Sequence, residues 1–263
     1  MFRNLTPVVK NLLLITVLLY FVSAMIMPQL KAIGALYYIH SSKFLPFQFL
    51  TYMFLHADGW HLFSNMLGLF IFGPLLEQYL GPKKLLTLWL VCGVGSGLLY
   101  SGYTAYRMNS LDQEIAAFNN DPTPERFNDF VKENRHLFRT GVFDFIDNFS
   151  RNPESKELKQ RARENMSQVR NIQANIPMVG ASGALFGVLI AFGMLFPNTQ
   201  LFLLFPPMPV KAKYLVLVYG LYTVYNVINN NPLDNVAHFA HLSGLLIGAI
   251  LVTYWRKKRD SFY

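Results

Sequence analysis

A serine and a histidine interrupt two otherwise apolar stretches of this sequence. Ser182 follows Gly180 and precedes the apolar run 184–196, while His241 lies in the apolar run that begins at His238. Polar and ionisable side chains at membrane depth are costly and usually serve a function. A serine hydroxyl beside an imidazole is a nucleophile with its general base. The two residues therefore predict a serine hydrolase whose catalytic pair lies within a membrane.

Two further polar residues could assist such a reaction. His61 and Asn65 are four positions apart, so they share one face of a helix. Both side chains carry N–H donors for the oxyanion of an acyl transfer, and loss of one such donor typically costs about 2.7–4 kcal/mol of barrier. Hydrogen bonding between membrane helices explains the pair equally well on sequence grounds alone.

The composition indicates a membrane protein. Hydrophobic residues make up 52% of the 263 residues, charged residues only 14%, and the mean hydropathy is +0.27. These values are too apolar for an ordinary soluble domain. We expect an all-α polytopic bundle, in which the single cysteine, Cys92, is a small buried residue within a span. A span needs roughly 20 mostly apolar residues, and six segments qualify: 11–30, 61–80, 84–104, 179–197, 212–230 and 235–255.

The basic charge indicates an orientation rather than a nucleic-acid partner. Segment 104–176 carries 11 basic and 11 acidic residues, so the other segments supply the whole net charge of +8. Only Lys31 and Lys43 fall in a loop on the opposite side. By the positive-inside rule both termini are cytoplasmic, as expected in a bacterial inner (plasma) membrane. Ten of the remaining basic residues fall on one side of a six-span protein: Arg3, Lys10, Lys83, Lys84, Lys211, Lys213, Arg256, Lys257, Lys258 and Arg259.

Glycines recur at a spacing that favours close helix packing. Gly183 and Gly187 are four residues apart, as are Gly244 and Gly248. Small residues at this spacing let membrane helices approach closely. We expect span six to pack against span four and to bring His241 to Ser182. Gly180 and Gly183 would also leave room for a substrate backbone.

One long polar insertion separates spans three and four. It divides the chain into 1–103, holding spans one to three, the insertion 104–176, and 177–263, holding spans four to six and a basic tail. Thr123-Pro124 and Asn152-Pro153 resemble helix starts. We expect short amphipathic helices on the membrane surface or on the outer ends of the spans. The insertion could cover or gate the cavity, or help to dock substrates; the alternative is a packed segment without a functional role.

Two stretches of the sequence, roughly 46–81 and 178–248, resemble the rhomboid family of intramembrane serine proteases, of bacterial type. The resemblance implies a six-helix bundle with a water-filled cavity, a Ser182–His241 dyad, and His61, Asn65 and the Ser182 backbone N–H as oxyanion donors. It also implies that the Phe186 ring stacks on His241. The motifs that carry the resemblance are His61-Leu62-Phe63-Ser64-Asn65, Glu77-Gln78-Tyr79-Leu80-Gly81, the run from Gly180 to Gly187, and Ala240-His241-Leu242-Ser243-Gly244 with Gly248.

Three points remain open at this stage. His238 lies three residues before His241 and is a rival base, although the glycine spacing of the family fits only His241. Asp234 is the only acidic residue near spans four to six, so we expect packing to orient His241. The family often has a Trp-Arg pair in its first outer loop, where this chain has 46–48 (Pro-Phe-Gln), so the anchoring of that loop could differ.

The predicted function is an intramembrane serine endopeptidase that cuts transmembrane segments of membrane proteins near their outer end. A substrate helix must unwind before its carbonyl can be attacked, so helix-breaking residues near the cut should favour cleavage. Transmembrane protein substrates and the lipid bilayer are the expected partners, and neither a metal, a cofactor nor nucleic acid is expected. The alternatives are a catalytically inactive rhomboid-like protein that binds or escorts membrane helices, and a small transporter.

Overall fold

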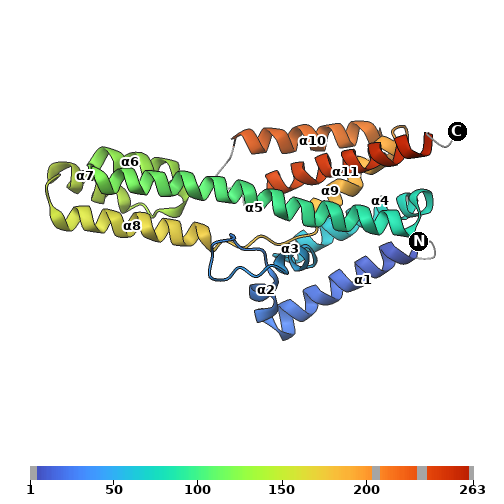
Figure 1. Ribbon diagram of the computed structural model, residues 1–263, viewed down its shortest axis with the longest axis horizontal. Helices are drawn as coiled ribbons and strands as arrows, with labels where there is room; N and C mark the ends of the chain where they lie inside the picture. Colours follow the sequence, from blue (N-terminus) through green and yellow to red (C-terminus); the bar gives the residue numbers. More distant parts are fainter. Residues whose placement is uncertain (1–4, 203–207, 230–235, 261–263) are drawn as a thin grey trace.

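The computed structural model describes residues 5–202, 208–229 and 236–260, without the side chains of 258–260. Arg3 and Asp234 therefore lie outside the described residues. The chain is almost entirely helical (Figure 1). Its elements are α1 (Pro7–Phe21), the π-helix η2 (Val22–Ile26), α2 (Pro28–Gly34), α3 (Gln48–Thr51), η3 (Tyr52–Phe54), α4 (Gly59–Leu80), α5 (Pro82–Asn120), α6 (Pro124–Glu133), η4 (Arg135–Leu137), α7 (Val142–Arg151), α8 (Lys156–Ala174), α9 (Ser182–Leu195), β1 (Gln200–Phe202), β2 (Pro209–Lys211), α10 (Ala212–Asn229) and α11 (His238–Asp260).

Four of the described helical segments are long and apolar enough to cross a membrane. They are Pro7–Ile26, Gly59–Leu80, Pro82–Asn120 and His238–Lys257. The expected spans four and five correspond to α9 and α10, which are not among these four. Helix α9 runs from Ser182 to Leu195 and has 14 residues, which is shorter than a full membrane span. The short antiparallel pair β1–β2 then joins α9 to α10.

Helix α9 is the centre of the membrane bundle. It packs against α4, α5, α10 and α11, and its side chains from Val188 to Phe192 lie in the larger hydrophobic core. A helix that is apolar all round is buried on all sides. Any polar group at its start is therefore held in a fixed position by the surrounding helices.

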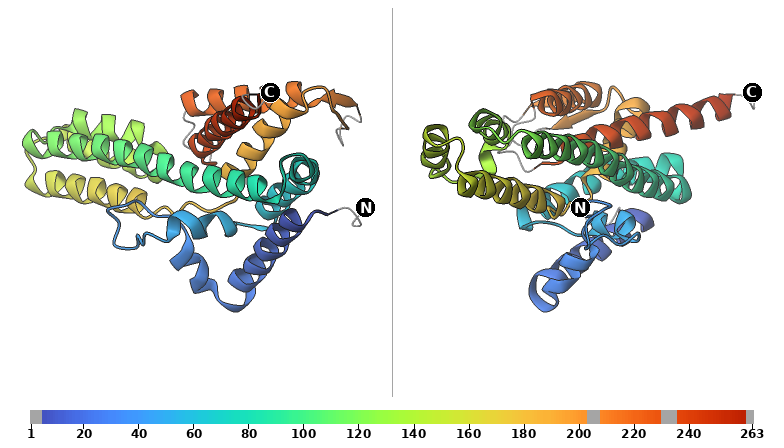
Figure 2. Two further views of the ribbon diagram at one scale, coloured as in Figure 1. Left: turned by 45° about the vertical axis from the view of Figure 1, so that its right-hand side comes forward. Right: turned by 60° about the vertical axis from the view of Figure 1, so that its left-hand side comes forward.

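Helix α5 is longer than the predicted span. The sequence predicts an end near residue 104, whereas the helix has 39 residues and continues to Asn120. Neither glycine nor proline occurs between Gly102 and Pro122, so nothing in the backbone stops the helix where the hydropathy falls. Figures 1 and 2 show α5 running from the membrane bundle into the insertion.

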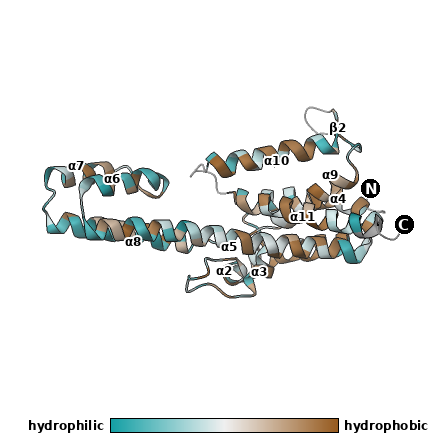
Figure 3. Cartoon of the chain, turned by 45° about the horizontal axis from the view of Figure 1, so that its top comes forward, coloured by the Kyte–Doolittle hydropathy of each residue, from teal (hydrophilic) through white to brown (hydrophobic). Residues whose placement is uncertain are grey.

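The insertion forms a second hydrophobic core of its own. Its apolar side chains are buried against one another and against Met108, Leu111 and Phe118 of α5. Of the two expected arrangements, the insertion therefore shows packing on the end of a span. The outward faces of helices α6, α7 and α8 are largely hydrophilic (Figure 3). The members of this core include Met108, Leu111, Phe118, Phe127, Phe130, Val131, Ile146, Phe149, Leu158 and Met166.

One of the two predicted helix starts in the insertion is right and the other is wrong. Thr123 caps α6 by accepting a hydrogen bond from the Arg126 backbone N–H, and Pro124 is the first helical residue. Asn152 instead follows the end of α7, and α8 begins only at Lys156. Ser155 caps α8 because its side-chain oxygen accepts from the Leu158 N–H.

Both described chain ends lie at the end of the bundle opposite the insertion (Figure 1). The buried Glu77 carboxylate accepts hydrogen bonds from the backbone N–H groups of Val8 and Val9, both at 3.0 Å. It thereby caps the free N–H groups at the start of α1 from the last turn of α4. On the same side, the Lys84 ammonium lies 5.8 Å from the centre of the Trp255 ring.

Candidate active site

The structure brings Ser182 and His241 together. The Ser182 Oγ and the His241 Nε2 are 2.7 Å apart, within hydrogen-bond distance. Ser182 is the first residue of α9, and His241 lies in the first turn of α11. A hydroxyl in contact with an imidazole nitrogen is the geometry of a nucleophile and its general base.

Glycine pairs make this contact possible. A Cβ added to Gly244 would lie 2.0 Å from the Gly183 carbonyl oxygen, and one added to Gly248 would lie 2.8 Å from the Gly187 Cα. Any larger side chain would therefore push α11 away from α9. The backbones of α9 and α11 touch within one helical turn of the Ser182–His241 contact. The two glycine pairs therefore set the distance between the Ser182 and His241 side chains.

Aromatic rings surround the His241 imidazole. The Phe186 ring stacks on it with 4.3 Å between ring centres and 9° between planes. Tyr219 of α10 meets Phe186 edge-on at 6.3 Å, and His238 meets His241 edge-on at 5.8 Å. It is His241, not the rival His238, whose nitrogen lies beside the Ser182 Oγ. His238 is buried against Tyr222, with 5.7 Å between ring centres.

His61 faces the segment that leads to Ser182. Gly180 has a φ of +127°, and a Cβ added there would lie 2.7 Å from the His61 Nε2. The Ala57 backbone N–H donates to the His61 Nδ1 at 3.5 Å, a weak bond that favours the tautomer with the proton on Nε2. Nε2–H is then a donor directed toward the backbone beside the nucleophile. Only glycine fits at position 180, for both its φ and its contact with the imidazole.

Asn65 is buried one turn after His61. Its amide nitrogen donates to the His61 carbonyl oxygen at 2.9 Å, within the same helix. A carboxamide nitrogen carries two hydrogens, so one donor of Asn65 is left for another acceptor. The Ser182 backbone N–H lies in the first turn of α9, where helical N–H groups have no partner within the helix.

The segment before Ser182 is held by the loop that joins α2 to α3 and by η3. Leu36 and Met178 exchange backbone hydrogen bonds of 2.9 and 2.8 Å, and the Gly180 N–H donates to the Tyr52 carbonyl at 3.0 Å. The Tyr52 hydroxyl in turn donates to the Gly93 carbonyl of α5 at 2.7 Å. These bonds fix the backbone that positions the nucleophile.

Gln48 anchors that outer loop in the place where the family often has an arginine. The side chain is fully buried. Its amide nitrogen donates to the carbonyls of Ile33 and Lys43 at 2.8 and 2.9 Å, and its oxygen accepts from the Tyr37 N–H at 3.3 Å. Three bonds to backbone groups thus hold the loop, and a neutral amide makes them without burying a charge.

Sequence reasoning missed His56, which lies in the loop before α4. Its ring is 1% exposed and meets the His61 ring edge-on, with 5.0 Å between ring centres. Burial, and to a lesser extent the neighbouring His61, lowers the pKa of His56 to about 3, so the ring is neutral at physiological pH. A second histidine five residues before His61 was the available signal in the sequence.

Among the described residues, no group of three or more His, Cys, Asp or Glu side chains is arranged to hold a metal ion. Cys92 is a buried free cysteine, and its Sγ lies 2.3 Å from the position that a Cβ on Gly187 would take.

The helices and this site define a polytopic helical membrane protein with a serine and a histidine in contact inside it. The chain belongs to the rhomboid family, because the Rhomboid domain matches residues 44–113 and 160–258, more than half of its length. The gap between the two matched segments falls within the insertion.

Three relatives illustrate the range of the family. The chain is 26% identical over 213 residues, 81% of its own length, to RHOMBOID-like protein 12, mitochondrial, of Arabidopsis thaliana. It is 29% identical over 80% of its length to an uncharacterized mitochondrial rhomboid protein of Schizosaccharomyces pombe. A shorter stretch of 60 residues, 23% of this chain and 21% of the relative, is 35% identical to the rhomboid protease AarA of Providencia stuartii. The chain spans about half the length of the first two, 47% and 51% respectively.

Proposed function

We propose that this chain is an intramembrane serine endopeptidase. The observation that carries the proposal is the 2.7 Å contact between the Ser182 Oγ and the His241 Nε2. A serine held in a membrane bundle for packing alone would not need an imidazole nitrogen at that distance. The relative AarA is named a rhomboid protease, which supports the same reading.

The reaction follows from the positions of these groups. His241 accepts the proton of the Ser182 hydroxyl as the oxygen attacks a peptide carbonyl, and later donates it to the leaving amine. Water then hydrolyses the acyl-enzyme with His241 again acting as base. The stack with Phe186 orients the imidazole in the plane that this transfer requires.

Three donors are available for the negative oxygen of the tetrahedral intermediate. They are the Ser182 backbone N–H, the His61 Nε2–H and the remaining amide hydrogen of Asn65. Loss of one such donor typically costs about 2.7–4 kcal/mol of barrier in hydrolases, roughly 10²–10³-fold in rate.

The proposed topology has six spans, with α9 and α10 as the fourth and fifth and both termini on the cytoplasmic side. The position of the basic residues supports this topology, because Lys84 lies beside Trp255 at the end of the bundle opposite the insertion. A bacterial inner membrane fits this charge distribution, although two of the relatives are named as mitochondrial. The insertion would then lie on the outer side.

The proposed substrates are single-pass membrane proteins cut near their outer end. Ser182, His241 and His61 all lie in the first turns of their helices, at the end of the bundle from which α5 continues into the insertion. A helical substrate must unwind to reach Ser182, so glycine or proline near the cut should favour cleavage. A helix-binding protein without catalysis is the competing function, but it would require neither the Ser182–His241 contact nor its aromatic support.

Cleavage in reconstituted vesicles tests the proposal. The purified chain is combined in proteoliposomes with a single-pass substrate that carries a glycine pair in the outer part of its span. Cleavage is expected from the unaltered chain and from His238→Ala, and not from Ser182→Ala or His241→Ala. Cleavage by Ser182→Ala would exclude the proposed nucleophile. Equal cleavage of a substrate whose glycines are replaced by leucine would exclude the requirement for unwinding.

A further inference from the structure

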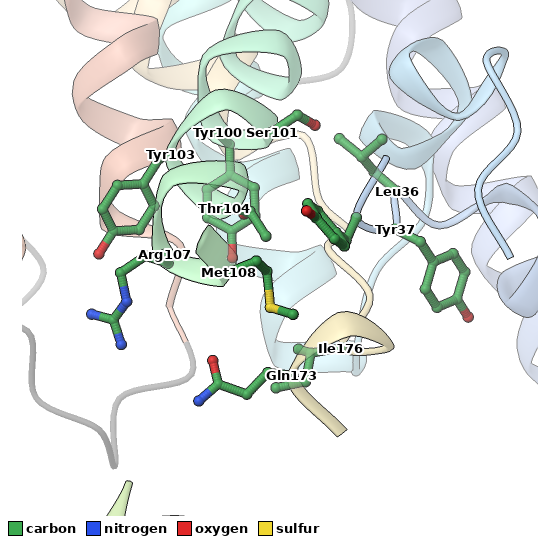
Figure 4. A pocket seen from close by; sticks show the side chains of 11 residues that line it. Leu36, Tyr37, Tyr100, Ser101, Tyr103, Thr104, Arg107, Met108, Gln173 and Ile176 are labelled. Carbon is green, nitrogen blue, oxygen red and sulfur yellow. The ribbon is translucent and has the colours of Figure 1, made fainter. Parts of the chain in front are cut away.

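A cavity of about 170 Å³ with both polar and apolar walls lies between α5, the loop that joins α2 to α3 and the end of α8. Figure 4 shows Arg107 and Tyr103 on its α5 side, Gln173 and Ile176 at the end of α8, and Tyr37 across from them. None of these residues takes part in the chemistry proposed for Ser182.

The cavity is rich in hydrogen-bond donors. Besides the guanidinium of Arg107, its walls carry the hydroxyls of Tyr100, Tyr103 and Thr104 and the amide of Gln173. A planar guanidinium with several N–H groups suits the oxygens of a phosphate. Phenol and alcohol hydroxyls can donate to the same oxygens.

Arg107 makes no ion pair with any residue in the described part of the chain. It is half-buried. Asp112, just over one turn further along α5, already accepts a bidentate pair of hydrogen bonds from Arg170 of α8. Glu114, two turns further along α5, interacts electrostatically with Arg107 but forms no ion pair with it. The guanidinium therefore lines the cavity without a direct carboxylate partner.

The cavity lies at the level where α5 leaves the hydrocarbon layer. Between Leu85 and Tyr106 the helix carries no charged residue, and Arg107 is the first charge after that stretch. At ~1.5 Å per residue, the uncharged stretch is long enough to cross a hydrocarbon layer of roughly 30 Å. Tyrosines around the cavity match the aromatic belt found at membrane interfaces.

We infer that this cavity binds the phosphate headgroup of an anionic phospholipid. The phosphate lies against Arg107, and the tyrosine and threonine hydroxyls bind its oxygens. The acyl chains descend along α5, where Leu98 and Leu99 are exposed apolar side chains about two turns below Arg107. A free phosphate would use the same donors but not this apolar surface.

A ligand in this cavity would contact two segments of the chain that lie close to the nucleophile. Tyr37 and Leu36 line the cavity from the outer loop, and Ile176 lines it from the segment that leads to Ser182. Leu36 and Met178 are already paired through their backbones. A bound headgroup would add a bridge between α5 and this pair, and would therefore raise the thermal stability of the protein.

Native mass spectrometry of the full chain, released from detergent with phosphatidylglycerol or phosphatidylcholine, tests the site without relying on activity. We expect phosphatidylglycerol to be retained preferentially. In Arg107→Gln its affinity should fall roughly tenfold, as expected for one lost charge-assisted hydrogen bond. Arg151→Gln, the same charge change in an exposed residue at the far end of α7, should bind like the unaltered chain.

Three further outcomes decide the inference. If Arg107→Gln folds poorly, Tyr103→Phe keeps the ring that stacks on Phe239 and removes only the hydroxyl; it too should weaken binding. Equal retention by Arg107→Gln and the unaltered chain, or equal loss in Arg107→Gln and Arg151→Gln, would overturn the site. Displacement of phosphatidylglycerol by inorganic phosphate alone would overturn the lipid as its ligand.

Discussion

The chemistry proposed for Ser182 depends on how the His241 ring is held, and Phe186 lies flat against that ring. Stacked aromatic pairs contribute about 0.5–1.5 kcal/mol beyond the area they bury. In Phe186→Leu the imidazole should lose this support, and kcat should fall roughly 2- to 12-fold with KM little changed. Steady-state kinetics on a vesicle-embedded substrate measures this.

Phe186→Tyr is the matched control for that substitution, because it keeps the ring and should keep kcat near the unaltered value. An unchanged kcat in Phe186→Leu, or a change confined to KM, would mean that the stack does not orient His241.

The buried His56 should make the fold sensitive to mild acid. Its folded-state pKa of about 3 lies below the ordinary value of 6.5, because burial disfavours the charged ring. As the pH falls below about 6.5, the unfolded chain takes up a proton that the folded protein excludes, so the free energy of unfolding decreases with falling pH. The loss should continue until the pH approaches 3.

Comparison of His56→Phe with the unaltered chain isolates this contribution. Thermal melting between pH 8 and pH 4 should show a shallower fall in stability for His56→Phe, which has no proton to exclude. Parallel curves for the two proteins over this range would contradict the assignment.

At the scale of the elements, the approach of α11 to α9 is what brings base and nucleophile together. Gly244→Ala places a methyl group where the Gly183 carbonyl oxygen now lies. Overpacking of this kind typically costs 1–3 kcal/mol, and it should also move His241 away from Ser182. We expect a lower melting temperature together with loss of activity.

Gly220→Ala in α10 is the matched control. The nearest atom to a Cβ there is a Leu245 methyl carbon at 4.0 Å, so the added group meets no close contact. Alanine is favoured over glycine within a helix by up to about 1 kcal/mol. Gly220→Ala should therefore melt at or above the temperature of the unaltered chain. If both variants melted alike, close packing of α9 and α11 would not be what stabilises the site.

At the scale of the whole molecule, the chain has two hydrophobic cores with no buried residue in common. The contact of Asp112 with Arg170 brings α5 and α8 together just outside the membrane bundle. Replacement of residues 113–169 by a short Gly-Ser linker between these two residues should leave the bundle folded and Ser182 reactive. We expect the cleavage of substrates to change, because the insertion lies at the same end of the bundle as the site. Unchanged cleavage of every substrate tested would exclude a role in gating or docking.

Much of the candidate site could be predicted because its members carry strong local signals. Ser182 and His241 are polar residues in apolar runs, and the glycines at four-residue spacing indicate which helices touch. His56 was missed because a histidine in a loop gives no periodic signal. The role of Gln48 was missed because three bonds to distant backbone groups leave no pattern in the sequence.

The fold was predicted less completely, and for physical reasons. Hydropathy reports where the membrane ends and not where a helix ends, so the continuation of α5 to Asn120 was missed. The apolar faces of α6 and α7 were expected on the membrane surface or on the outer ends of the spans, because amphipathicity does not say what covers an apolar face. Here the other helices of the insertion cover it.

The central claim is that Ser182 is a nucleophile activated by His241. Labelling of the detergent-solubilised protein with a fluorescent fluorophosphonate tests it most directly, with Ser182→Ala, His241→Ala and His238→Ala beside the unaltered chain. We predict labelling of the unaltered chain and of His238→Ala only. Absence of label on a folded unaltered chain, or equal labelling of His241→Ala, would contradict the proposed dyad.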